Sequence, residues 1–148
     1  MGLNRLGRLR KRLPVRPVEV SVRCEATPEQ LTTVHEALAR LWAELSPQPA
    51  DEWRMMFDLA VSEVAANIVE HAQPPYMSLR LSAAAGRVVA EFADGGRGWS
   101  GPPSPSRLVD DLSERGRGLA LARTAVDEVV YERDGPVNRW RLIKWLAP

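Results

Sequence analysis

Residues 57–72, with the sequence FDLAVSEVAANIVEHA, predict a helix that packs one side against an apolar core. At about 100° per residue, its apolar side chains fall on one broad arc, formed by Ala60, Val61, Val64, Ala65 and Ile68. Glu63, Asn67 and His71 recur every four residues and therefore form one row at the edge of that arc. A carboxylate and an amide beside an apolar face indicate a helix whose edge borders a site. We interpret His71 as structural, because it lies near the expected end of the helix.

The order of the other periodic segments predicts the fold class. Residues 18–24 alternate apolar and polar side chains, as does a strand with one side in solvent. Further strands are expected at 77–81, 88–92, 128–133 and 140–146, and helices at 27–46, 51–72 and 119–126. Thr27 and Pro28 suit the N-cap and the first turn of the first helix. This order predicts an α/β (α+β) fold, a two-layer sandwich in which helices cover one face of a mixed, mainly antiparallel sheet of about five strands.

The charges of the chain are unevenly distributed. Residues 1–16 contain six bases and no acid, namely Arg5, Arg8, Arg10, Lys11, Arg12 and Arg16. Residues 17–148 hold the other 14 bases and all 19 acids, which gives them a net charge of −5. We expect a flexible basic arm at 1–16, whose leucines could alternatively form a short amphipathic helix on a partner or an anionic surface. The acidic domain at 17–148 argues against direct nucleic-acid binding, because nucleic-acid-binding domains usually present a basic face.

Length and composition indicate the number of domains and the cellular compartment of the protein. The 148 residues fit one domain. No apolar run is long enough to cross a bilayer, and no apolar signal-peptide core follows the basic arm. The single cysteine, Cys24, is expected to be a small buried thiol within a strand. These features favour a cytoplasmic protein without a membrane partner.

Two glycine-rich motifs follow the third predicted strand. The first is DGGRGW at residues 94–99, and the second is GRGL at residues 116–119, which we expect to open a helix. Residues 94–118 hold six of the ten glycines, and a loop of this length in a compact domain is usually functional. Each motif alone is common in turns, but the combination with the polar row on the helix is far less common.

These residue types suit the binding of a nucleoside triphosphate. Backbone N–H groups at a glycine-rich helix start attract phosphate. Asn67 offers a neutral oxygen ligand for Mg²⁺, and Glu63, one turn away, could take a proton from an attacking hydroxyl. Asp94 could accept a hydrogen bond from the exocyclic amine of adenine, whereas guanine carries an oxygen at that position.

The three motifs, in this order, resemble the ATPase domain shared by gyrase B, Hsp90, sensor histidine kinases and MutL (the Bergerat fold). LAVSEVAANIVEHA resembles the N box of that superfamily, and ADGGRGW resembles its Asp-x-Gly-x-Gly-aromatic box. GRGLALARTAVDEVVYER resembles its last glycine box with the helix and strand that follow. The resemblance spans roughly residues 18–146. The short length resembles one branch, the anti-sigma factor serine/threonine kinases of bacterial partner-switching systems.

The resemblance implies a role for each matching residue. Glu63 is expected to be the catalytic carboxylate, Asn67 the Mg²⁺ ligand and Asp94 the adenine contact. Further nucleotide contacts are expected at Gly96, Gly98, Gly116, Gly118 and Leu119. ATP is expected between the helix and the glycine-rich loop, with residues 99–115 as a mobile lid. The chain departs from the family at Asn138, where a threonine near the adenine is usual.

The function that the resemblance implies is an ATP- and Mg²⁺-dependent serine/threonine kinase. Its substrate is expected to be an anti-sigma factor antagonist and its second partner a sigma factor, and members of this branch are often homodimers. An alternative is a non-catalytic ATP-binding module that sequesters a partner, against which the intact Glu63 argues mildly. A catalytic fragment of a sensor histidine kinase is less favoured, because no phospho-acceptor helical hairpin is predicted before residue 18. A basic-arm binder of nucleic acid or membrane is the least favoured.

Overall fold

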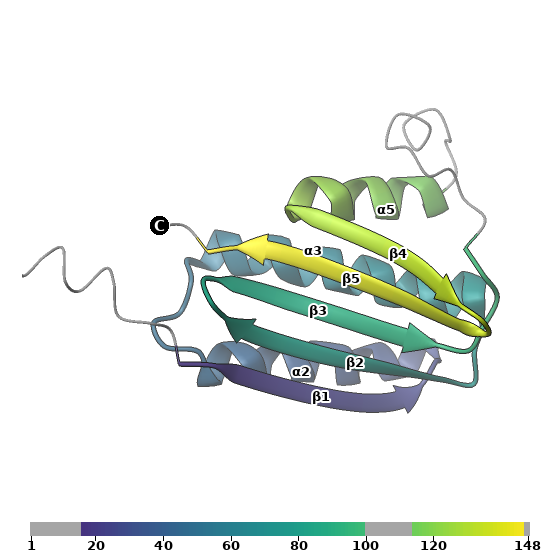
Figure 1. The fold of residues 1–148 in the computed structure, drawn as a ribbon, viewed down its shortest axis with the longest axis horizontal. Coiled ribbons are helices and arrows are strands. Elements are labelled where there is room, and N and C mark those ends of the chain that lie inside the picture. The colour runs from purple at the N-terminus through teal and green to yellow at the C-terminus, as the bar shows by residue number, and fades with distance from the viewer. Residues whose placement is uncertain (1–15, 100–113, 147–148) are drawn as a thin grey trace, which may run out of the picture.

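The structure is a computed structural model that describes residues 16–99 and 114–146. Figure 1 shows two layers, a five-stranded sheet and a layer of helices on one of its faces. The strands are β1 (Val18–Glu25), β2 (Tyr76–Ala84), β3 (Arg87–Asp94), β4 (Glu128–Asp134) and β5 (Val137–Trp145). The helical segments are η1 (Pro28–Gln30), α2 (Leu31–Glu44), α3 (Asp51–Asn67), η2 (Ile68–Ala72) and α5 (Glu114–Ala125).

The sheet has the strand order β1-β2-β3-β5-β4, and all its neighbouring pairs are antiparallel. The predicted two-layer α+β sandwich with helices on one face is therefore confirmed. The mixed character that we expected of the sheet is wrong for the described strands. Two tight hairpins, β2–β3 and β4–β5, lie next to each other, and β1 joins the free edge of β2 in the opposite direction.

Tight turns make the hairpin strands longer than the sequence predicted. Only Ala85 and Gly86 remain unpaired between β2 and β3, and their φ angles are 52° and 77°. Two residues with positive φ form a turn that matches the twist of a hairpin, so pairing continues to the residues that flank the turn. In the second hairpin Gly135 has a φ of 57°, and β5 begins at Val137 rather than at the expected residue 140.

Helix α3 lies in the middle of the helical layer, between α2 and α5 (Figure 1). The five residues of its predicted apolar arc are fully buried, namely Ala60, Val61, Val64, Ala65 and Ile68. The sheet faces this arc with large buried side chains such as Leu81, Phe92 and Leu142. The core-facing side of the helix is therefore the one that its periodicity predicted.

A π-helical turn ends the helix that carries the polar row. Helix α3 continues as η2, and Gln73 follows in the left-handed conformation with a φ of 51°. The N–H of Gln73 donates to the carbonyl of Ile68 at 3.0 Å, and the two prolines that follow cannot continue the helix. Such turns inside α-helices occur frequently at functional sites, and this one lies between Asn67 and Gln73.

Several smaller expectations differ from the structure. Thr27 occupies the N-cap of η1, but its side chain makes no capping hydrogen bond. Cys24 is half-buried rather than fully buried, and this burial raises the pKa of its thiol. Residues 1–15 of the expected arm and most of the expected lid at 99–115 lie outside the described residues. Within the part of the chain that the structure describes, no helix has the length and apolar character needed to span a membrane.

Candidate active site

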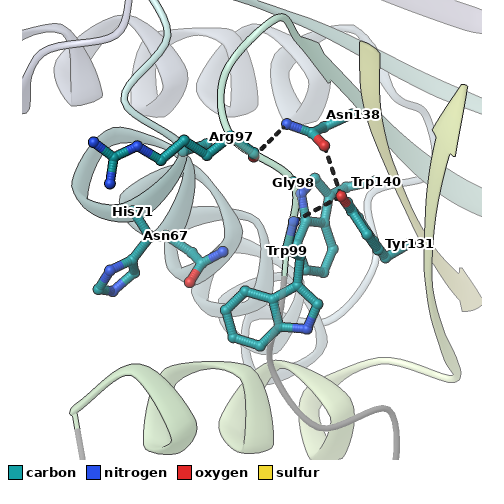
Figure 2. A pocket seen from close by; sticks show the side chains of 9 residues that line it. Asn67, His71, Arg97, Gly98, Trp99, Tyr131, Asn138 and Trp140 are labelled. Atoms are coloured by element: carbon teal, nitrogen blue, oxygen red, sulfur yellow. Dashed lines mark hydrogen bonds between the residues drawn. The ribbon is translucent and has the colours of Figure 1, made fainter. Parts of the chain in front are cut away.

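A cavity of about 140 Å³ lies where the end of α3, the segment after β3 and the helix-facing sides of β4 and β5 meet (Figure 2). Its walls are formed by Asn67, His71, Ala72, Arg97, Gly98, Trp99, Tyr131, Asn138 and Trp140. A second hollow, also about 140 Å³, is lined by Glu63, Ala66, Asn67, Glu70, His71, Gly118 and Leu119. Asn67 and His71 belong to both hollows, so the predicted polar row borders both of them.

Asn67 is buried at the boundary of the two hollows, although its side chain is polar. Its exposed fraction is 9%, and its Oδ1 atom has no hydrogen-bond partner among the described residues. A buried amide oxygen without a partner costs free energy, so a group that binds this oxygen stabilises the site. A hard cation such as Mg²⁺ suits a neutral oxygen ligand of this kind.

The donor set around Asn67 fits a Mg²⁺ ion that is shared with a substrate. The described residues contain no group of three or more His, Cys, Asp or Glu side chains that could hold a metal ion by themselves. Mg²⁺ keeps several waters and is usually held by one or two protein oxygens together with substrate phosphates. The residues present are therefore compatible with Mg²⁺ bound through Asn67 and a nucleotide.

Asp94, the last residue of β3, has one carboxylate oxygen fixed and one unpaired. Its Oδ1 accepts hydrogen bonds from the N–H of Gly96 at 2.8 Å and from Nδ2 of Asn138 at 2.9 Å. Its Oδ2 is buried and has no hydrogen-bond partner among the residues that the structure describes. The unpaired oxygen is an acceptor for a donor that enters the site, as expected for the amine of adenine.

Gly96 allows the segment after β3 to lie directly against the end of η2. A Cβ atom at Gly96 would overlap the carbonyl oxygen of Ala72. The N–H of Arg97 donates to that same carbonyl at 2.9 Å, which holds the segment in place. At Gly95, by contrast, an added Cβ would meet nothing within 4 Å. The close approach therefore requires a glycine at position 96 and not at position 95.

Replacing Gly96 by alanine should destabilise the protein by about 1–3 kcal/mol, because overpacking against a backbone atom forces the chain to shift. Denaturant unfolding of the variant and the wild type measures the difference. Gly95→Ala is the matched control, and its free energy of unfolding should stay within about 0.5 kcal/mol of the wild type. Equal stability of the two alanine variants would contradict the close approach of Gly96 to Ala72.

Glu63 on α3 lies against Gly118 on α5. Its Oε2 atom would stand 2.5 Å from a Cβ added at Gly118, so a side chain there would displace the carboxylate or separate the helices. The neighbouring Leu119 is buried and also lines the second hollow. The structure thus brings together Glu63, Gly118 and Leu119, three of the predicted site residues, around the second hollow.

Helix α5 begins at Glu114, which corrects the predicted position of the second glycine motif. We expected the glycines in a turn before a helix at 119–126, but Gly116 is the third residue of the helix and Gly118 the fifth. Gly116 lies in the first described turn of α5, and backbone N–H groups in the first turn of a helix can bind an anion. The N–H of Gly118 lies inside the helix, and a side chain at this position would have to displace the carboxylate of Glu63.

Aromatic side chains form one wall of the first cavity (Figure 2). The ring centroid of Trp140 lies 4.7 Å from that of Tyr131 and 6.1 Å from that of Trp99. Trp99 belongs to the predicted DGGRGW motif, but sequence reasoning missed Tyr131 and Trp140. The signal that could have found them is the pairing of β4 with β5, which sets Tyr131 opposite Trp140. Gly98 lines the same cavity, and a Cβ there would stand 3.2 Å from Cδ of Arg133, whose flexible side chain can move.

Fold and site together define a class of protein. A family model described as "Histidine kinase-like ATPase domain" matches residues 24–144, which include every predicted site residue. The chain belongs to the histidine kinase-like ATPase family. The resemblance of its three motifs to that superfamily is therefore confirmed.

Within this family the chain is similar to proteins named serine-protein kinase RsbW. It is 36% identical over 92 residues to RsbW of Bacillus licheniformis and 37% identical over 92 residues to RsbW of Bacillus subtilis (strain 168). Both alignments cover 54% of this chain and 58% of the relative, so the chain spans little more than half the length of these relatives. The solved structure of the RsbU and RsbW domains of Rv1364c from Mycobacterium tuberculosis matches with a TM-score of 0.65. The two sequences are 22% identical, and the match covers 93% of this chain and 34% of the Rv1364c chain. This match supports the fold alone.

Proposed function

We propose that this chain binds ATP together with Mg²⁺ and transfers the γ-phosphate to a serine or threonine hydroxyl of a small protein. The observation that carries the proposal is a pair of buried acceptor oxygens, Asn67 Oδ1 and Asp94 Oδ2, without hydrogen-bond partners among the described residues. A phosphate-bound Mg²⁺ and the amine of adenine are the partners that these two oxygens lack. The similarity to proteins named serine-protein kinase supports the same assignment.

ATP occupies both hollows in this proposal. Each hollow alone is smaller than the roughly 300 Å³ at which ligand pockets usually begin. The base lies in the first hollow, which is lined by Asn138, the hydrogen-bond partner of Asp94, and the phosphates lie beside Glu63 and Gly118 in the second. The N–H of Gly116 provides a phosphate contact at the N-terminus of α5, where the helix dipole also favours negative charge.

The reaction in this proposal is an in-line phosphoryl transfer. The hydroxyl oxygen of the protein substrate forms a bond to the γ-phosphorus, the bond to the β–γ bridging oxygen breaks, and ADP leaves. Glu63 accepts the proton of the attacking hydroxyl. Mg²⁺, when bound, neutralises charge on the phosphates, and Asn67 is its protein ligand.

We further propose that the protein substrate is an anti-sigma factor antagonist and that a sigma factor is the second partner. This role rests on the resemblance of the three motifs to the anti-sigma factor kinases, and a homodimer is proposed on the same ground. Direct contact with nucleic acid is not part of the proposal, because residues 17–148 carry a net charge of −5.

Transfer of labelled γ-phosphate tests this function. The protein is incubated with Mg²⁺, labelled ATP and each candidate antagonist encoded by the same genome, and the phosphoamino acid of any labelled product is identified. We expect serine or threonine phosphate on one candidate. ATP binding without transfer to any candidate would support the non-catalytic module instead. Absence of ATP binding would exclude both functions.

Replacing Asn67 by alanine should remove most of the dependence of ATP affinity on Mg²⁺. The affinity of the wild type should rise by at least about tenfold when Mg²⁺ replaces a chelator, a factor typical of groups that support a bound metal. The ATP affinity of the variant should rise little when Mg²⁺ is added, because the variant lacks the proposed metal ligand. Calorimetric titration with ATP in both conditions measures the two gains, and thermal unfolding checks that the variant is folded. A variant with the Mg²⁺ dependence of the wild type would show that Asn67 is not the ligand.

A further inference from the structure

Asn138 lies at the centre of the hydrogen-bond network that surrounds the first cavity. It is the second residue of β5, stands opposite Asp94 of β3 on one side and Arg133 of β4 on the other, and has an exposed fraction of 1%. Because β5 lies between β3 and β4, this residue joins the proposed base contact on β3 to the far strand β4.

The Nδ2 group of Asn138 faces only acceptors. It donates to Oδ1 of Asp94 at 2.9 Å, to the carbonyl oxygen of Arg97 at 2.7 Å and to that of Gly96 at 3.2 Å. These three acceptors share two amide hydrogens, so the donor capacity of the side chain is used completely. The amide thereby fixes both the carboxylate of Asp94 and the glycine-rich segment that follows it.

The Oδ1 atom of Asn138 faces only donors. It accepts from the hydroxyl of Tyr131 at 2.6 Å and from Nη1 of Arg133 at 2.7 Å, which uses both of its lone pairs. Reversal of the amide would set donors against Arg133 and an acceptor against Asp94, so the neighbours select one orientation. Every polar atom of Asn138 is occupied, and none is left to contact a base.

Tyr131 extends this network to the other side of the cavity. Its hydroxyl donates to Asn138 and accepts from the backbone N–H of Trp99 at 2.8 Å, as the dashed lines in Figure 2 show. A threonine, the residue that the resemblance leads one to expect at position 138, has a single hydroxyl hydrogen. It cannot donate to Asp94, Gly96 and Arg97 at once. The asparagine therefore holds a larger part of the site than a threonine could.

We propose that Asn138 is a specificity-determining positioning residue that holds Asp94 by Oδ1, so that only the acceptor Oδ2 meets the purine base. This inference rests on the proposed ATP-binding function and deepens it. A fixed acceptor attracts the amine at C6 of adenine and repels the oxygen at C6 of guanine. Without Asn138 only the N–H of Gly96 still holds Oδ1, so the carboxylate of Asp94 is fixed less firmly and its preference for adenine over guanine falls.

Calorimetric titration of ATP and of GTP, each with Mg²⁺, tests the inference through the ratio of the two dissociation constants. Asn138→Leu keeps the approximate shape of the side chain and removes all hydrogen bonds of that side chain. This variant should reduce the preference for ATP over GTP by at least about tenfold. Tyr131→Phe removes one hydroxyl and should reduce the preference about threefold. If the Asn138→Leu variant does not fold, the nucleotide preference of the Tyr131→Phe variant tests the inference. Tyr76→Phe, at the only other tyrosine and 48% exposed, is the matched control and should keep the ratio of the wild type.

The ratio separates positioning from a merely structural role. A structural defect weakens the affinities for ATP and GTP by the same factor. An unchanged ratio in the folded Asn138→Leu or Tyr131→Phe variant would therefore overturn this inference but leave the proposed ATP-binding function intact. A wild-type protein that binds neither nucleotide would overturn the proposed function, and the inference with it. A selective loss of ATP affinity in the variants supports the inference.

Discussion

Replacing Glu63 by glutamine should lower the rate of phosphoryl transfer by about 10²- to 10⁴-fold, the usual contribution of a general base. The affinity for ATP should change by no more than about threefold, because glutamine has the same size and the Oε2 position beside Gly118 stays occupied. Single-turnover transfer to the identified protein substrate measures the first effect, and calorimetry measures the second.

Glu70→Gln is the matched control for this prediction. Glu70 borders the same hollow as Glu63 and undergoes the same chemical change, but it is exposed and lies beyond the end of α3. Its variant should transfer phosphate at close to the rate of the wild type. If Glu63→Gln also retained that rate, the proton would have to leave by another route, and the role of Glu63 as base would be wrong.

Replacing Asp94 by asparagine should weaken ATP binding by about 10- to 100-fold, the range for a hydrogen bond to a charged group. The N–H of Gly96 and Nδ2 of Asn138 both donate to Oδ1, so the new amide keeps its oxygen there and turns its nitrogen toward the base. A donor then meets the amine of adenine, which is also a donor. The same nitrogen can donate to the oxygen of guanine, so GTP should lose much less affinity than ATP.

Calorimetric titration of both nucleotides checks the Asp94→Asn prediction. Asp134→Asn is a suitable control, because Asp134 is exposed at the end of β4 and the substitution removes the same charge. That variant should bind ATP with the affinity of the wild type. An Asp94→Asn protein that bound ATP equally well would show that the base is recognised elsewhere.

The features that sequence could predict are those that arise within one element. The four-residue spacing of Glu63 and Asn67 sets them in one row wherever the helix lies, and its apolar arc is buried as predicted. The strands were also predictable, because the alternation of apolar and polar side chains arises within a single strand. The register between strands was not, because the turn at Gly135 decides which residue stands opposite Asn138.

The features that sequence could not predict arise between distant segments. Gly118 was expected in a turn, since a glycine costs about 1 kcal/mol inside a helix relative to alanine. A side chain at position 118 would have to displace the carboxylate of Glu63, which belongs to another helix. Asn138 was noted only as a departure from threonine, because the five hydrogen bonds of its side chain join it to two distant stretches of chain, residues 94–97 and 131–133. The roles proposed for Glu63 and Asn67 stay predictions until the variants are measured.

The aromatic wall of the first cavity also gives the protein an optical signal of its own. Trp99 and Trp140 line the cavity, whereas Trp42 and Trp53 pack with Phe57 in a separate cluster. Residues 53 and 67 are separated by about 20 Å along the helix axis, so that second cluster lies away from the proposed base. Indole emission depends on the polarity of the surroundings, and a base that enters beside two of the indoles changes it. Nucleotide occupancy can thus be followed by the intrinsic fluorescence of the unlabelled protein, with the distant indoles as a constant background.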